Sequence, residues 1–368
     1  MILEKLSLLN FKNYTEAQLS FSEKFNCFVG NNGVGKTNIL DAIHYISFCK
    51  SYFNSIDSQN IQHDLPFFAI QAWVNKNDVV DEIYCAIKRG HKKQFKRNKK
   101  EYERLSEHIG LYPLVMISPS DSELILDGSE VRRKFIDSII SQYDKHYLET
   151  LIAYNHALQQ RNALLKYFYE SRTFDALSLE IWDDKLSSFG EIIIGKRAAF
   201  LDEFTPLFNK NYAFISGNNE LASVDYLAST KGKPFKEVLQ SNLDRDKIVH
   251  ITTSGPHKDD LEFKLLNTSL KKFASQGQQK SYLLALKLAQ FEFIKDKTNT
   301  KPLLLLDDVY DKLDEHRFTK LIELVSSDNF GQVFITDTHL ERMNRLFLKS
   351  NTKHSIFIVE NGNVNQHG

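Results

Sequence analysis

The stretch FNCFVGNNGVGKTNILDAIHYISF (25–48) decides how this chain folds. Its opening residues, FNCFV (25–29), form the short apolar run of a buried strand, and apolar residues recur at helical spacing in NILDAIHYISF (38–48). Between them stands GNNGVGKT (30–37), which matches the P-loop pattern at every position. The pattern also sits where it must, after a strand and before a helix, so the segment predicts a phosphate-binding loop.

The residue types of this loop are suited to binding a nucleoside triphosphate. Glycines let backbone N–H groups close around phosphates, and the start of the following helix adds a favourable partial charge. Lys36 is expected to reach the β- and γ-phosphates, and the Thr37 hydroxyl to ligate Mg²⁺. The sequence therefore predicts binding of ATP and Mg²⁺ by eight residues: Gly30, Asn31, Asn32, Gly33, Val34, Gly35, Lys36 and Thr37.

A second signal is an apolar run that ends in two acids. Leu303 to Leu306 are four consecutive leucines, as in a parallel strand buried on both faces, and Asp307 and Asp308 follow them. In parallel sheets such acids emerge at the same edge as a P-loop. We expect Asp307 to hold Mg²⁺, directly or through water, and Asp308 to act as general base on the attacking water.

The segment SQGQQK (275–280) precedes a clear helix pattern at 281–294. It resembles the signature motif of ABC ATPases, in which a Ser and a Gly at a helix start bind the γ-phosphate held by another subunit. We therefore expect Ser275 and Gly277 to contact nucleotide, and Ser275 and Gln278 to contribute to catalysis. The simpler alternative is that Ser275 only caps the helix.

Two further segments follow the acids. DKLD (311–314) resembles the D-loop of ABC ATPases, which crosses their dimer interface. FITDTHL (334–340) follows a strand pattern where these proteins carry a switch residue, for which Thr336, Thr338 and His339 compete. Our prediction names Thr338 and His339, and a plain surface-loop histidine is the alternative.

The whole chain resembles the RecF family of ABC/SMC-head-type ATPases. The stretch between Thr37 and Ser275 is too short for the long coiled coil of SMC proteins. The family's own motifs recur as NFKNY (10–14), PSDSELILDGSEVRRKFIDSIISQYD (119–144), NHALQQRNALLK (155–166) and SGPHKDD (254–260). The chain departs from the family where Lys12 and Lys258 replace the usual arginine, which keeps the charge and loses a bidentate fork. SFCKSYF (47–53) also departs from the family's usual stretch.

The resemblance implies an α/β fold, an ABC-type P-loop ATPase head with an inserted helical arm and no long coiled coil. It places the ATPase domain at 1–120 and 209–368 and the arm at 121–208, with strand-like segments near 211–228. It also implies that Lys12 contributes to the nucleotide site. The implied activity is an ATP-dependent homodimer that clamps single-stranded and gapped duplex DNA, helps to load a RecA-type recombinase with RecR and RecO, and releases DNA by slow, DNA-stimulated hydrolysis.

Charge alone does not indicate a DNA-binding protein, because Lys+Arg and Asp+Glu both number 47. Any DNA surface must be local. Eight of the thirteen residues in KRGHKKQFKRNKK (88–100) are basic, which predicts phosphate contacts on a hairpin or turn. The DNA-binding candidates are Lys92, Lys93, Lys96, Arg97, Lys99 and Lys100. A solvated hairpin is the alternative, and Arg132, Arg133 and Lys134 form a second candidate that could equally pair with acids.

The composition and the N-terminal residues indicate the cellular location that we expect for the protein. The three cysteines have no metal-type spacing, and the start MILEKL (1–6) lacks the pattern of a signal peptide. No apolar run is long enough to span a membrane. We therefore expect a cytoplasmic protein without a membrane partner.

Other classes remain as alternatives. The first is an SMC-like structural ATPase that acts through a protein partner without touching DNA. A transporter ATPase does not explain the helical block at 129–208, and an ATPase–nuclease would need a catalytic domain for which we see no room after Asp307.

Overall fold

The computed structural model describes residues 1–217, 220–310, 315–348 and 353–367. The chain divides into two compact units, which are described separately. The first unit comprises Met1–Asp121 and Gln290–Gly368, and the second comprises Ser122–Ala289.

The first unit contains an antiparallel sheet with the strand order β2-β1-β4-β5-β6-β7. Its strands are β1 (Ile2–Phe11), β2 (Tyr14–Ser20), β4 (Phe67–Lys76), β5 (Val79–Lys88), β6 (Gln94–Arg97) and β7 (Lys100–Glu101). Buried and exposed residues alternate along β4 and β5, as expected for a sheet that is covered on one face. Asn77 and Asp78 join these two strands with φ of 55° and 61°, the two-residue turn that matches the twist of a hairpin.

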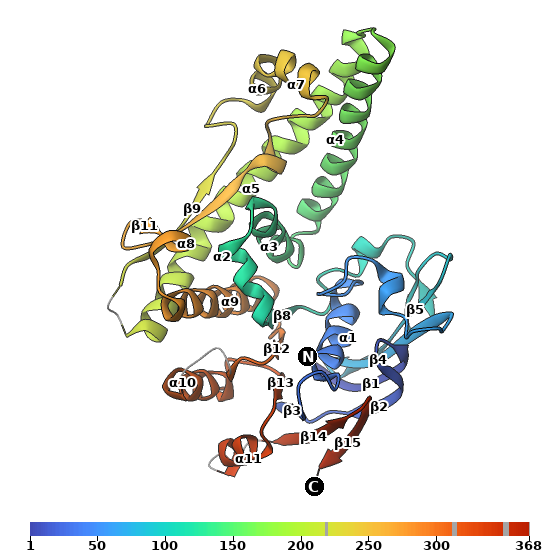
Figure 1. Cartoon of the computed structure of the whole chain (residues 1–368), viewed down its shortest axis with the longest axis vertical. Helices are drawn as coiled ribbons and strands as arrows, with labels where there is room; N and C mark the ends of the chain where they lie inside the picture. Colours follow the sequence, from blue (N-terminus) through green and yellow to red (C-terminus); the bar gives the residue numbers. More distant parts are fainter. Residues whose placement is uncertain (218–219, 311–314, 349–352, 368) are drawn as a thin grey trace. The chain divides into compact units, whose positions relative to one another are not determined.

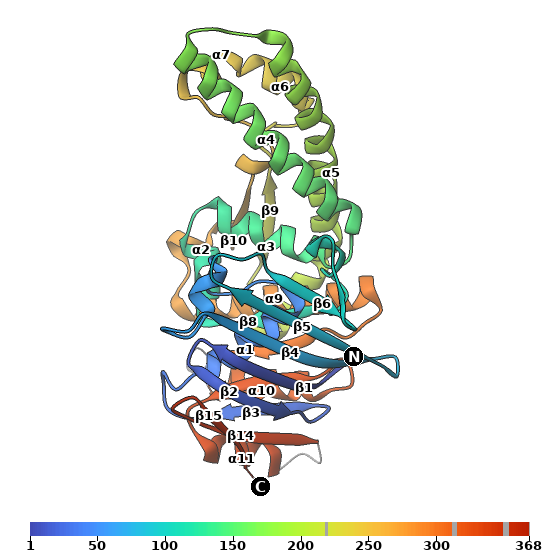
Figure 2. The same cartoon turned by 90° about the vertical axis from the view of Figure 1, so that its right-hand side faces the viewer.

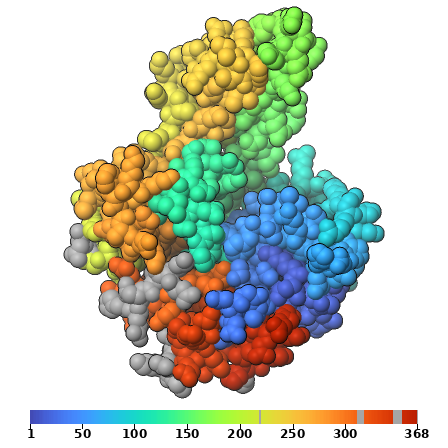
Figure 3. Space-filling view, in the orientation of Figure 1, coloured from blue at the N-terminus to red at the C-terminus, as the bar shows by residue number. Residues whose placement is uncertain are grey.

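The second sheet of this unit is mostly parallel, with the order β15-β14-β3-β13-β12-β8. Its strands are β3 (Phe25–Val29), β8 (Leu114–Ile117), β12 (Leu303–Leu306), β13 (Val333–Asp337), β14 (His354–Glu360) and β15 (Asn363–His367). Every residue of β3, β8, β12 and β13 is buried, which explains why these strands are mostly apolar. Because β14 pairs with β3, the red C-terminal strands lie against blue N-terminal segments in the space-filling view (Figure 3).

Helix α1 (Lys36–Phe48) contacts β4 of the antiparallel sheet and β8 and β13 of the parallel sheet. The antiparallel strands β1 and β4 run in front of it in Figure 2. Its buried face includes Ile39, Leu40 and Ile43, which join one core with residues of both sheets. The helix is thereby held in place directly after the P-loop. The other helices of this unit are η1 (Asp57–Asn60), η2 (Leu105–Glu107), α10 (Glu315–Ser326) and α11 (Leu340–Leu348); η3 (Pro119–Ser122) ends at the boundary with the second unit.

The second unit is built on two long helices, α4 (Lys145–Ser171) and α5 (Ala176–Ser216), which run side by side (Figure 1, green). Asp144 and Asp175 cap their first turns with side-chain hydrogen bonds to backbone N–H groups. The shorter helices are α2 (Glu123–Leu126), α3 (Ser129–Ser141), α6 (Phe235–Ser241), α7 (Leu243–Val249), η4 (Pro256–Lys258) and α8 (Leu270–Phe273). Helix α9 (Gln276–Thr298) begins in this unit and continues into the first.

A small antiparallel sheet completes the second unit. Its order is β11-β10-β9, with β9 (Ala222–Leu227), β10 (Asp260–Leu265) and β11 (Thr268–Ser269). Phe263 of β10 and Phe208 of α5 both contact the ring of Tyr282 on α9, with centroids 5.4 and 4.7 Å away. This aromatic cluster joins the sheet to α5 and to the start of α9.

The compact units differ from the domain boundaries expected from the sequence. Residues 209–289, which we assigned to the ATPase domain, group with the helical segment instead. The expectation of strands near 211–228 was wrong at its start, since α5 continues to Ser216 and the strand covers only Ala222–Leu227. Pro206 lies inside α5, where it removes one backbone donor without ending the helix.

Candidate nucleotide-binding site

The P-loop has a conformation that requires glycine at two positions. Gly35 has a φ of 114°, and a Cβ there would lie 2.3 Å from the side chain of Asn13. A Cβ on Gly30 would lie 2.3 Å from the carbonyl oxygen of Val359. The loop is therefore closely packed on its protein side. Asn31, Asn32 and Gly33 are exposed on the other.

Two residues that sequence reasoning did not assign to the site hold the loop. Asn13 donates to the carbonyl oxygen of Val34 over 2.8 Å and accepts a hydrogen bond from Asn38 over 2.7 Å. The Tyr14 hydroxyl donates to the carbonyl oxygen of Gly35 over 2.9 Å. Both residues belong to the segment NFKNY (10–14), so that motif was the signal for them.

Lys36 lies under the loop. It is only 4% exposed, and its Nζ donates to the carbonyl oxygens of Gly30 and Asn31 over 2.7 and 2.9 Å. These two carbonyls hold the ammonium group inside the curve of the backbone. The contact of Lys36 with phosphates stays a prediction.

The two acids expected beside the loop are there. Thr37 Oγ1 donates to Asp307 Oδ1 over 2.9 Å, and Thr336 Oγ1 lies 2.9 Å from the same oxygen. Thr336 also accepts a hydrogen bond from the backbone N–H of Asp308 over 2.8 Å. Strand β13 lies between β3 and β12, so its Thr336 joins the acids to the P-loop side of the sheet.

The oxygen atoms of Thr37 and Asp307 fit a magnesium site. Mg²⁺ prefers oxygen ligands in an octahedron at about 2.0–2.1 Å, which places neighbouring ligands about 2.9 Å apart. The 2.9 Å between Thr37 Oγ1 and Asp307 Oδ1 has that spacing. No group of three or more His, Cys, Asp or Glu residues suited to a metal occurs in the described part of the chain. This pair would thus take an ion that keeps phosphate and water ligands.

Burial determines the electrostatics of Asp307. Its side chain is 3% exposed, and desolvation raises its pKa to about 6 against the opposing effect of the hydrogen bonds from Thr37 and Thr336. Asp308 is less buried and has a φ of 45°, so the chain turns sharply where the strand ends. The two neighbouring carboxylates therefore occupy different environments.

The three switch candidates lie in different surroundings. Thr336 is 1% exposed and contacts both acids, whereas His339 is exposed and its backbone N–H bonds to Asp337. Of the three, only Thr336 has a described contact with the acid pair. The assignment of the switch to Thr338 or His339 stays a prediction. The segment 311–314, predicted as a D-loop, lies outside the described residues.

Lys12 is paired within the protein. Its Nζ lies 2.6 Å from the buried carboxylate of Asp41 and 5.4 Å from the ring centroid of Phe53. Asp41 also accepts hydrogen bonds from Ser51 Oγ and the Tyr52 backbone N–H, each over 2.6 Å. The segment SFCKSYF (47–53), which departs from the family pattern, therefore binds the same carboxylate as Lys12.

In the second unit, Ser275 forms a reciprocal cap with Gln278. The Ser275 backbone N–H donates to Gln278 Oε1 over 2.8 Å, and the Gln278 N–H donates to Ser275 Oγ over 3.3 Å. Gln278 Nε2 donates to Glu220 over 2.5 Å. The helix cap considered from the sequence is therefore present. Ser275 remains exposed, and Gly277 follows it within the first turn.

The basic run 88–100 divides into two groups. Lys93 pairs with Asp57 over 2.7 Å, and Arg97 pairs with Asp81 over 2.9 Å. These two predicted DNA contacts are occupied by internal carboxylates. The candidates Lys92, Lys99 and Lys100 are exposed, and Lys96 is partly exposed near the ring of Tyr84.

The second basic candidate, 132–134, also pairs internally. Arg132 forms a bidentate pair with Asp260, and Lys134 pairs with Glu130 over 2.7 Å. Arg133 donates to a hydroxyl and a backbone carbonyl. The acid-pairing alternative therefore holds for Arg132 and Lys134.

Comparisons with known proteins agree with this architecture. A family model described as RecF/RecN/SMC N terminal domain matches residues 2–365. The DNA replication and repair protein RecF of Flavobacterium johnsoniae is 51% identical over 97% of this chain and 99% of its own. RecF of Bacteroides thetaiotaomicron is 51% identical over 100% of this chain and 99% of its own.

Two solved structures have folds similar to that of this chain. The recombination mediator protein RecF with ATP, of the RecFOR pathway, has a TM-score of 0.91 and 31% identity, covering 100% of this chain and 98% of that one. An Smc head domain of Pyrococcus furiosus has a TM-score of 0.57 and 18% identity, covering 100% and 96%, which shows the fold alone. Among the described helices, none is both long and apolar enough to cross a membrane. The predicted fold class, an ABC-type ATPase head with helical segments, is confirmed, and the chain belongs to the RecF family.

Proposed function

We propose that this chain is an ATP-dependent DNA-binding protein of recombinational repair that acts at single-strand gaps. The observation that carries the proposal is the cluster of Thr37, Asp307, Thr336 and Asp308 beside a closed P-loop. Support for ATP and for repair comes from relatives named as RecF and from a RecF solved with ATP.

Each residue has a role in binding or hydrolysis. Backbone N–H groups of the loop and Lys36 bind the phosphates, and Thr37 and Asp307 hold Mg²⁺, which would offset the phosphate charge when bound. Asp308 takes the proton of the attacking water, with Thr336 fixing its backbone. Ser275, Gly277 and Gln278 of a second copy complete the site at the γ-phosphate.

In this proposal the chain dimerises only when ATP is bound, and the dimer clamps DNA. Hydrolysis of ATP then releases the DNA. The functional ATPase domain spans 1–120 and 209–368, because Ser275 acts with a P-loop although it groups structurally with the helices. We place the protein in the cytoplasm, with RecR, RecO and a RecA-type recombinase as partners.

The test is sizing by light scattering without nucleotide, with ATP and with ADP, each with and without gapped duplex DNA. A dimer that forms with ATP, strengthens with DNA and dissolves with ADP is expected. A monomer under every condition would overturn the clamp. ATP-dependent dimers that fail to retain DNA in filter binding would favour the SMC-like alternative.

Three variants locate the steps. Lys36→Met should lose ATP binding, and Ser275→Arg should bind ATP yet stay monomeric. Asp308→Asn should form a dimer that persists, because its hydrolysis is slow. ATP-dependent dimers of Ser275→Arg would remove that residue from the interface, and hydrolysis at the parent rate in Asp308→Asn would remove its general-base role.

A further inference from the structure

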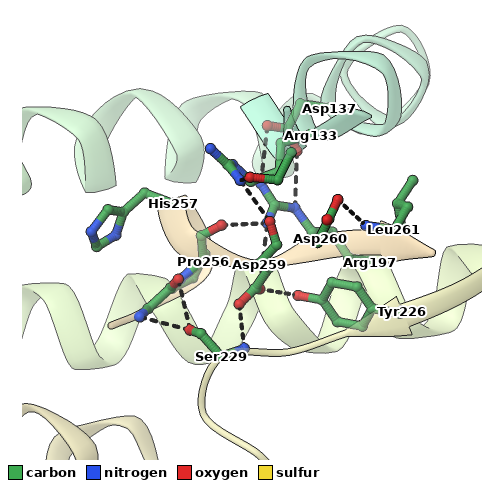
Figure 4. Close-up of polar contacts among 12 residues, drawn as sticks. Arg133, Asp137, Arg197, Tyr226, Ser229, Pro256, His257, Asp259, Asp260 and Leu261 are labelled. Carbon is green, nitrogen blue, oxygen red and sulfur yellow. Dashed lines mark hydrogen bonds and ion pairs between the residues drawn. The ribbon is translucent and has the colours of Figure 1, made fainter. Parts of the chain in front are cut away.

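Two motifs that the nucleotide site does not use meet in the second unit. Arg132, from the segment 119–144, binds Asp260 through two hydrogen bonds of 2.7 and 3.0 Å. Its neighbour Arg133 donates to the carbonyl oxygen of Asp259 over 2.6 Å. Asp259 and Asp260 end the segment SGPHKDD (254–260), so the two motifs hold each other although they are far apart in sequence (Figure 4).

A buried arginine of α5 fixes this junction. Arg197, 2% exposed, binds Asp137 through two hydrogen bonds of 3.0 Å and donates to the carbonyl oxygen of Pro256 over 2.8 Å. Asp259 accepts from the backbone N–H of Ser229 over 2.7 Å and from the hydroxyl of Tyr226. The walls are therefore rigid, since their charged groups are tied on several sides.

A cavity of about 280 Å³ opens against this junction, between α3, α4, α5 and η4. Its volume exceeds the roughly 150 Å³ of an engineered cavity that holds benzene. Leu151, Tyr154 and Pro256 give it an apolar wall, and the exposed Asn155 lies at its lining on α4. The space is large enough for a side chain from another molecule.

His257 forms a fixed, neutral part of the lining. The Tyr154 hydroxyl lies 2.6 Å from its Nδ1, and its Nε2 lies 3.0 Å from the carbonyl oxygen of Thr252. A carbonyl can only accept, so Nε2 carries the proton and Nδ1 accepts from Tyr154. Burial lowers the pKa of His257 to about 4, which leaves the ring uncharged at neutral pH.

One cation of the lining has no carboxylate partner among the described residues. Arg197 pairs with both Asp137 and the buried Asp259, and Lys134 pairs with Glu130. Arg133 lines the cavity with bonds only to the Ser129 hydroxyl and a backbone carbonyl, and it forms no ion pair with a carboxylate within the described residues. A half-buried guanidinium in this state favours an incoming anion that offers two oxygens.

We propose that this cavity binds one acidic side chain, next to an apolar one, from a segment of a partner protein. The apolar wall beside Arg133 suits such a pair, and one carboxylate would give Arg133 the ion-pair partner that it lacks. Nucleic acid fits less well, because Glu130 and Asp137 in the same lining repel a chain of phosphates. The inference does not depend on the nucleotide site.

The test uses the full chain and an array of peptides Ser-X-Glu-X-Ser, in which X runs through all natural residues, with a matched array that carries Gln for Glu. Binding should require Glu and favour apolar X. Arg133→Gln should weaken it about tenfold or more, since a charge-assisted pair is lost. Asn155→Trp, which fills the cavity and leaves the arginine bonds intact, should do the same.

Lys166→Gln is the matched control, because it removes a cation from α4 outside the lining and should bind as the parent does. Thermal unfolding of each variant separates loss of the cavity from loss of the fold. Peptide binding that ignores Glu, or that survives both Arg133→Gln and Asn155→Trp, would overturn the proposal. So would a loss of affinity for gapped DNA, and not for peptide, in those two variants.

Discussion

Thr37 Oγ1 and Asp307 Oδ1 lie 2.9 Å apart, which joins the start of α1 to the end of β12. The two residues follow strands that are not neighbours, because β13 runs between β3 and β12. Their hydrogen bond therefore shows that the P-loop and the acid pair lie at the same edge of the sheet. The same two oxygens are the proposed magnesium ligands, so the contact can be tested by its metal dependence.

Replacing Thr37 by Val should abolish the dependence of ATP affinity on Mg²⁺ and lower the stability by about 1–3 kcal/mol, because the buried Asp307 loses a donor. Thr37→Ser keeps the hydroxyl and is the matched control. Titration of a fluorescent ATP analogue with and without Mg²⁺, together with urea unfolding, measures both effects. Parent-like Mg²⁺ dependence in Thr37→Val would contradict the assignment.

Thr336→Val should slow hydrolysis while ATP still binds. The substitution keeps the shape of a strand residue, but the backbone N–H of Asp308 loses its acceptor and Asp307 loses a partner. Single-turnover hydrolysis should fall at least several-fold. Thr338→Val serves as the control, since no described contact joins it to the acids. Equal effects of the two substitutions would argue against a special role for Thr336.

Glu220 should influence dimer formation without touching nucleotide. It accepts hydrogen bonds from Gln278 over 2.5 Å and from the Tyr212 hydroxyl over 2.6 Å, and Gln278 in turn caps α9 with Ser275. Glu220→Ala should weaken the ATP-dependent dimer several-fold and leave ATP affinity unchanged. Tyr212→Phe removes only the second bond and should have the smaller effect. A Glu220→Ala chain that dimerises normally would show that the cap needs no such support.

Within the basic run 88–100, substitution of the exposed lysines should affect DNA binding, whereas substitution of the ion-paired Lys93 should affect stability. Changing Lys88, Lys92, Lys99 and Lys100, all exposed, to Glu should make the fall of log affinity for DNA with log salt less steep, by up to about 3.6 at roughly 0.9 per phosphate contact. Lys93→Met should reduce stability instead, because it leaves Asp57 without its ion pair. An unchanged slope in the fourfold variant would discard this surface.

Burial of His108 predicts a loss of stability in mild acid. Its Nε2 lies 2.6 Å from the carbonyl oxygen of Ile46, and Tyr102, Tyr112, Arg97 and Asp81 surround it. Burial lowers its pKa to about 4, against about 6.5 in the unfolded chain. The unfolded state therefore binds the extra proton first as the pH falls.

The contribution of His108 is complete above pH 6.5 and should decline by about 3 kcal/mol as the pH falls from 6.5 to 4. Urea unfolding across this range should show the slope, and His108→Gln should flatten it. The exposed His63 offers a control, since His63→Gln should leave the slope as it is. A slope that survives in His108→Gln would assign it to other groups.

Much of the first unit could be predicted because its signals are local. Alternation along β4 and β5, the apolar runs of β3 and β12 and the glycine pattern at 30–37 each lie within one element. The boundary near 208 could not be predicted, because the packing of β9 against α5, and of β10 against β9, decides it.

The sequence by itself determined the family, the P-loop and the acids after β12, since these depend on residue type and short spacing. Tertiary structure alone decided which groups meet. Thr336 reaches Asp307 only because β13 is inserted between β3 and β12, and Lys93 turns from a DNA candidate into a partner of Asp57. The physical reason is that strand order and ion pairing join residues distant in sequence, and their energies depend on burial and register that no local pattern contains.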